Sequence, residues 1–120
     1  MECTIVSVPT ERVNDWDSFH DVFKELLGFP DFYGRNMNAW IDCMTSVDHA
    51  EHGMSTTTVN KGELLILNIE DAADFQKRCP EQYEALLECT AFVNYRRTNK
   101  RHHPEGPVLA LLLSGHFKRV

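Results

Sequence analysis

The chain has 120 residues, 42% of them apolar, and a formal net charge of −6. This length predicts one domain, residues 1–120, that can bury a hydrophobic core without disulfides. The longest apolar run, at 108–113, is far shorter than the roughly 18 residues of a membrane span, and the first residues lack the basic and apolar regions of a signal peptide. We therefore expect a cytoplasmic protein with no membrane contact.

Charge is unevenly distributed along the chain. Residues 1–88 carry seventeen acids and six bases, whereas residues 89–120 carry one acid and six bases. An acidic surface repels nucleic acid and attracts basic proteins, although it also serves simply to keep a protein soluble. The basic run at 96–103 is interpreted either as the favourable positive end of a helix, which we prefer, or as an RNA-binding segment.

Sequence motifs for catalysis or for metal binding are missing. No nucleotide-binding loop or nucleophile elbow follows an expected strand, so we do not expect an enzyme or a cofactor. His49 and His52 have the spacing of two metal ligands, but no cysteine or carboxylate at zinc spacing accompanies them, so no metal site is expected. The cysteines form no C-x-x-C pair, and we expect buried free thiols at Cys3, Cys43, Cys79 and Cys89.

The first half of the chain predicts one strand and two helices. A strand at 3–8 is rich in β-branched residues. A helix with a 3.6-residue apolar period runs to Leu27 and ends at Gly28, a residue that suits the left-handed position after a helix. Its candidate caps are Asp15, Asp17 and Ser18. A short helix covers 36–45, and a polar loop covers 48–62, a length that is often functional in a compact domain.

The second half predicts two strands that flank two helices. The elements expected are a strand at 64–69, helices at 71–78 and 80–98, a basic loop at 96–107, a strand at 108–113 and a tail at 116–120. Residues 64–69 are apolar on both faces, which is typical of a central strand covered on both sides. The whole order is β-α-α-β-α-α-β. Because helical crossovers connect parallel strands, it predicts an α/β fold with a three-stranded parallel sheet covered by helices.

The segment 28–44 carries the most information about function. Its helical part places Met37, Trp40, Ile41 and Met44 on one apolar face. The opposite face carries Asn38, Asp42 and Thr45 and is expected to be exposed. An aromatic loop that leads into a helix with one exposed aspartate suits the recognition of a cationic groove.

The run Phe-Pro-Asp-Phe-Tyr-Gly-Arg-Asn-Met-Asn-Ala at 29–39 resembles the signature of the barstar family, the inhibitors of barnase-type ribonucleases. The family signature is similar to Leu-Pro-x-Tyr-Tyr-Gly-x-Asn-Leu-Asp-Ala. The resemblance implies the same α/β order and a protein that plugs the active site of a ribonuclease, where a carboxylate replaces the phosphate of RNA. Tyr33, Gly34 and Asn36 match the signature directly.

Other positions of the motif have changed. Phe32 keeps the ring of a family tyrosine that covers the nuclease's catalytic histidine, Asn38 replaces an aspartate, and Arg35 reverses a common charge. Asp42 matches the principal aspartate, and Glu84 or Glu88 is expected to add an acidic contact from the last helix. The implied partner-binding residues are Phe32, Tyr33, Gly34, Arg35, Asn36, Asn38, Asp42, Thr45 and Glu88.

Simpler structural interpretations exist for several of these residues. Core packing explains one of Phe32 and Tyr33, a sharp turn explains Gly34, and a solvated helix face explains Asp42. With the motif included, we expect an inhibitor that binds a cognate basic ribonuclease toxin one-to-one, is a monomer when free, and protects the producing cell. The alternatives are an immunity protein for a non-ribonuclease toxin and an RNA-binding module that uses residues 96–103.

Overall fold

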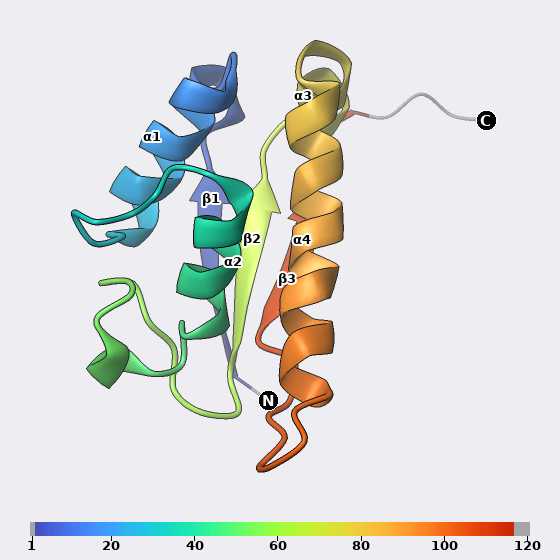
Figure 1. Cartoon of the computed structure of the whole chain (residues 1–120). Helices are drawn as coiled ribbons and strands as arrows, with labels where there is room; N and C mark the ends of the chain where they lie inside the picture. The colour runs from blue at the N-terminus through green and yellow to red at the C-terminus, as the bar shows by residue number, and fades with distance from the viewer. Residues whose placement is uncertain (1, 117–120) are drawn as a thin grey trace.

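The computed structural model describes residues 2–116 and consists of a three-stranded parallel sheet with four α-helices (Figure 1). The strands are β1 (Cys3–Val8), β2 (Leu64–Ile69) and β3 (Leu109–Leu113). The helices are α1 (Trp16–Leu27), α2 (Met37–Thr45), α3 (Ala72–Arg78) and α4 (Pro80–Thr98), with 3-10 turns η1 (Thr10–Arg12) and η2 (Ala50–His52). The predicted α/β class and element order are confirmed. Of the tail expected at 116–120, only His116 lies within the described residues.

The helices cover only one face of this sheet. Strand β2 lies between β1 and β3, and helices α1, α2 and α4 lie on the same side of all three strands (Figure 1). On the covered face, β2 buries Leu65, Leu67 and Ile69. On the open face, Ile5 of β1 is 58% exposed and Leu112 of β3 is 48% exposed.

The expectation that residues 64–69 are covered on both faces is therefore wrong. The reason is the strand order β1-β2-β3, which proceeds in one direction across the sheet. Right-handed crossovers that step in one direction place every helix on the same side, and covering both sides requires the order to reverse.

The expectation that all four thiols are buried also fails, because Cys3 lies exposed on β1, whereas Cys43 and Cys79 are buried.

Helix α1 begins and ends as its sequence predicts. Among the three candidate caps, Asp15 is the one used: its carboxylate accepts the Ser18 N–H at 2.8 Å, and the Ser18 hydroxyl accepts the Asp15 N–H at 3.0 Å. Gly28 ends the helix with a φ of 66°. A Cβ atom there would lie 1.7 Å from Oγ1 of Thr56, so glycine also lets the following loop pack on the helix end.

The polar loop 48–62 is more ordered than its composition predicts. It contains the 3-10 turn η2, and it is tied to the core by backbone hydrogen bonds from Thr56 to the Leu27 carbonyl and from Val59 to the Val47 carbonyl, each 3.0 Å long. The side chain of Val59 is buried. These contacts fix the loop beside helix α2.

The basic segment 96–107 contains one buried base. Its first three residues belong to the last turn of α4, as the helix expected at 80–98 implies, and β3 begins at Leu109, one residue later than expected. Arg97 is buried rather than solvated. It is 3% exposed and forms a bidentate ion pair with Asp48, with N–O distances of 2.7 and 2.8 Å. The segment therefore contributes a buried connection between α4 and the end of α2.

No helix within residues 2–116 is long and apolar enough to cross a bilayer.

Candidate partner-binding surface

The aromatic loop before α2 contains one buried ring and one exposed ring. Tyr33 is 6% exposed, packs against Phe29 at a centroid distance of 4.8 Å, and places its hydroxyl 2.5 Å from Nδ1 of His20. Phe32 is 74% exposed. Tyr33 therefore belongs to the core, and Phe32 presents its ring to solvent, where a partner can cover it.

Burial changes the ionisation of the Tyr33–His20 pair. It raises the pKa of the Tyr33 hydroxyl above its usual range. It also lowers the pKa of His20, which the positive charge of Arg35 lowers further. A neutral His20 ring can accept the Tyr33 hydroxyl proton at Nδ1, and this hydrogen bond anchors the loop to α1.

Residues 34–36 have clear structural roles within the chain. Gly34 is not in the left-handed region, so the expected requirement for glycine in a sharp turn is wrong; the residue with positive φ is Arg35, at 54°. The Arg35 guanidinium donates to Asp21 at 2.8 Å and to the Asp17 carbonyl at 3.1 Å. Asn36 caps α2 by accepting the Ala39 N–H at 2.8 Å. Close approach of a partner to Gly34 stays a prediction.

Helix α2 has the two faces that its spacing predicts. Trp40 and Met44 are fully buried, which fixes the helix against the core. Asn38 and Asp42 are exposed on the other face. Thr45 is partly buried, and its hydroxyl donates to the Ile41 carbonyl at 2.6 Å. Asp42 is therefore presented on a rigid support.

The acid expected to contact a partner from the last helix, Glu84 or Glu88, is not the α4 residue beside Asp42, and its contact with a partner stays a prediction. The α4 residue at that place is Arg96, whose Nη1 lies 3.0 Å from Oδ1 of Asp42. Glu88 is exposed on α4, eight residues earlier, which corresponds to about 12 Å along the helix. The structure thus brings a base to the Asp42 carboxylate and leaves Glu88 apart from it.

Two shallow hollows border Asp42. One is lined by Asp42 together with residues that include Phe32, Gly34, Cys43 and Met54. The other is lined by Asp42, Thr45, Ser46, His52, Met54 and Arg96. Phe32, Gly34, Asp42 and Thr45 are thus predicted residues that the structure gathers on one surface. Met54, His52 and Arg96 were missed, because they come from segments whose position relative to α2 is set only by the tertiary fold.

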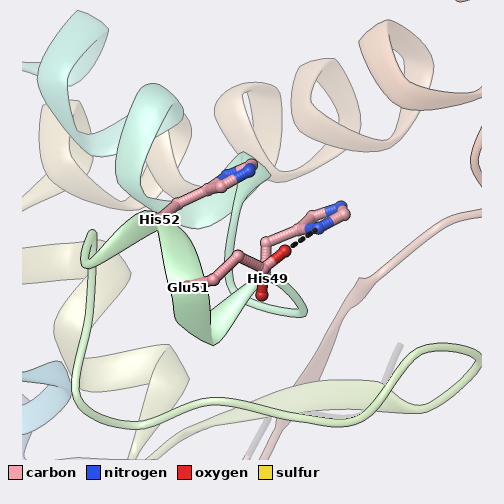
Figure 2. Close-up of side chains that lie close together, drawn as sticks. All are labelled: His49, Glu51 and His52. Carbon is pink, nitrogen blue, oxygen red and sulfur yellow. Dashed lines mark hydrogen bonds and ion pairs between the residues drawn. The ribbon is translucent and has the colours of Figure 1, made fainter.

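A cluster of ionisable side chains lies next to this surface, where η2 meets the loop after α4. The ring of His49 lies with Nδ1 3.0 Å from Glu51 and stacks on His52 at a centroid distance of 4.6 Å (Figure 2). Its Nε2 lies 2.5 Å from Glu105. These carboxylates raise the pKa of His49. A hydrogen bond from Lys100, with help from His49 and Arg97, lowers the pKa of Glu105 to about 2. Glu51 lies between the two histidines in the sequence, without the usual zinc spacing, whereas Glu105 reaches His49 only through the tertiary fold.

Comparison with known proteins agrees with the fold and the motif. The family model described as Barstar (barnase inhibitor) matches residues 3–105. Among curated proteins, the chain is 58% identical over 26 residues to "Putative ribonuclease inhibitor YrdF" of Bacillus subtilis (strain 168). That match covers 22% of this chain and 29% of the relative, so it compares one segment of each protein.

Proposed function

Because the chain belongs to the barstar family, we propose that it binds a basic ribonuclease toxin one-to-one and blocks the active site of that toxin. In this role it is a monomer when free and protects the cytoplasm of the producing cell. It has no catalytic task, and its effect comes from occupying the cleft in which RNA would bind.

The observation that carries this proposal is the position of Asp42 on α2. Its side chain is 57% exposed, while Trp40 and Met44 on the opposite face hold the helix in the core. A ribonuclease cleft is lined with cationic groups that bind phosphate, and a carboxylate on a rigid support can take the place of a phosphate with charge-assisted hydrogen bonds. The exposed ring of Phe32 borders the same hollow and adds apolar area to the contact.

The net charge of −6 supports the same kind of partner. Opposite net charges attract two proteins before they touch, which accelerates their association, and dissolved salt screens the attraction over roughly 8–10 Å near physiological ionic strength. A basic ribonuclease should therefore associate with this acidic protein faster than a neutral or acidic protein would.

The RNA-binding alternative loses support at the basic segment. Arg96 is paired with Asp42, Arg97 with Asp48, and Lys100 with Glu105. Bases that are already paired with acids of the same chain contribute less to phosphate binding, because each must break an existing contact. A toxin that is not a ribonuclease remains the second candidate, favoured by the neutral Asn38 and by Arg96 beside Asp42.

An inhibition assay tests the proposed function. Purified full-length protein is titrated against barnase and against the toxin encoded next to its gene, with cleavage of a fluorescent RNA as the readout. We expect inhibition to be complete at one equivalent for the neighbouring toxin, with an association rate that falls as salt is raised. If both nucleases keep full activity at excess inhibitor, the ribonuclease proposal is wrong. If inhibition is tight but its rate does not depend on salt, the electrostatic part is wrong.

A further inference from the structure

The turn η2 places two imidazole rings on the same side of the chain. His49 precedes this 3-10 turn and His52 is its last residue, so the two are three residues apart. In a 3-10 helix, side chains three residues apart lie one above the other. The rings are accordingly stacked, with an interplanar angle of 9°, and the Glu51 carboxylate lies beside His49 (Figure 2). One ligand atom from each of the three residues lies within 4.8 Å of the others.

The surroundings of His49 fix the orientation of its ring. Its Nε2 faces Glu105, a carboxylate that Lys100 holds at 2.8 Å. When Nε2 donates its proton to Glu105, the lone pair of Nδ1 points toward Glu51. A metal-binding histidine commonly has this arrangement, in which the second ring nitrogen donates to a carboxylate that sets the tautomer and the orientation.

The charge of the cluster is also suited to a cation. Asp48 is paired with Arg97, and Glu105 is paired with Lys100. Within residues 2–116, Glu51 has no ion-pair partner other than His49. A lone pair of His49 and a carboxylate oxygen of Glu51 that lie 3.0 Å apart repel one another unless a proton or a metal ion lies between them.

We propose that His49, Glu51 and His52 form a binding site for a divalent transition-metal ion, with Zn²⁺ as the preferred ion. Two imidazole nitrogens and one carboxylate are a ligand set that Zn²⁺ accepts, with water in the fourth position. Imidazole nitrogen is a poor ligand for Mg²⁺ and Ca²⁺, which favour oxygen. Asp48 and Glu105 are engaged by cationic side chains and act as orienting groups.

Side-chain rotations are needed to complete the site, because the stacked rings of His49 and His52 present nearly parallel lone pairs that do not converge on one ion. Ligand atoms about 2.0–2.1 Å from a tetrahedral ion lie roughly 3.4 Å apart, so the present separations of up to 4.8 Å must shrink. Glu51 and His52 are both exposed and can turn without disturbing the core. His52 also lines the hollow that contains Asp42 and Arg96, so the bound ion would stiffen one wall of the partner-binding surface.

Titration calorimetry of the tag-free full chain with ZnCl₂ tests this site, and CoCl₂ provides a visible absorption spectrum that reports tetrahedral ligation. We expect one Zn²⁺ per chain, no detectable binding of MgCl₂, and at least tenfold weaker Zn²⁺ binding in both His52→Ala and Glu51→Gln. The control His102→Ala changes an exposed histidine outside the site and should bind like the parent.

Several outcomes would overturn the metal site. These are absence of Zn²⁺ binding, equal binding by His52→Ala and the parent, and loss of binding in Cys3→Ser, which would assign the ion to the exposed thiol. Thermal unfolding without metal should be the same for His52→Ala and Glu51→Gln as for the parent, because both side chains are exposed. The measurement needs no toxin, so its result is independent of the proposed inhibition.

Discussion

Asp42 on α2 and Arg96 on α4 form an ion pair with an O–N distance of 3.0 Å, across 54 residues of sequence. Both side chains remain about half exposed, at 57% and 47%. An exposed pair of this kind contributes only about 0–1 kcal/mol to stability, so its presence affects recognition more than folding. A partner that binds the Asp42 carboxylate must either displace Arg96 or accept its positive charge in the interface.

Replacing Arg96 should therefore improve binding to a cationic cleft that has not been adapted to it. We expect Arg96→Gln to bind barnase roughly two- to fivefold more tightly than the parent, because one like charge is removed from the rim of the interface. Surface plasmon resonance at low salt measures the change. Arg101→Gln removes an exposed base from the following loop and serves as the control. Weaker binding by Arg96→Gln would mean that Arg96 faces an acid in the nuclease.

The buried pair of Asp48 and Arg97 should be important for folding. Their side chains are 4% and 3% exposed, and the nearest N–O distance is 2.7 Å. Removing one partner leaves a buried charge without compensation, which costs about 3–5 kcal/mol. Asp48→Ala should lower the free energy of unfolding by this amount, which is measured as a lower urea midpoint. Arg101→Gln should not change it, and an equal, small effect of both substitutions would show that the Arg97 pair is dispensable.

Sequence patterns predicted the elements of this fold and much of one surface. The helical spacing of Trp40 and Met44 predicted which face of α2 is buried, and therefore that Asp42 is exposed. This prediction is possible because the spacing of side chains around a helix depends only on the local sequence. The burial of Arg97 was not predicted, since its basic neighbours resemble a solvated helix end and its partner Asp48 is 49 residues away. The Asp42–Arg96 pair and the contacts of His49 with Glu105 likewise depend on how α2, η2 and α4 pack together.

Stability should depend on pH through His20. Burial lowers the pKa of His20 in the folded protein below its ordinary value, which the unfolded chain retains. As pH falls through about 6.5, the unfolded chain binds a proton that the folded protein binds less readily, so the stability due to this group is present above that pH and is lost below it. The parent should therefore lose more stability between pH 7.5 and pH 5.0 than His20→Gln.

Thermal unfolding of both proteins at the two pH values measures this difference. Glutamine can still accept the Tyr33 hydroxyl but does not titrate, so the comparison isolates the His20 proton from the other acids and bases that both proteins share. Equal pH dependence in the two proteins would show that the His20 ring is protonated as easily in the fold as in the unfolded chain.

Substitution of Asp42 tests the phosphate-mimic mechanism directly. Asp42→Ala should reduce affinity for the cognate toxin by at least about 2 kcal/mol, roughly thirtyfold, because it removes the carboxylate that would accept charge-assisted hydrogen bonds from the cleft. Its unfolding free energy should change by less than about 1 kcal/mol, since the side chain is exposed and its pairing with Arg96 is weak. Calorimetry against the toxin and denaturant unfolding separate the two effects. Glu11→Ala, which removes an exposed acid from η1, controls for the loss of one negative charge and should bind almost like the parent. If Asp42→Ala and Glu11→Ala bind equally well, the surface around Asp42 does not contact the toxin.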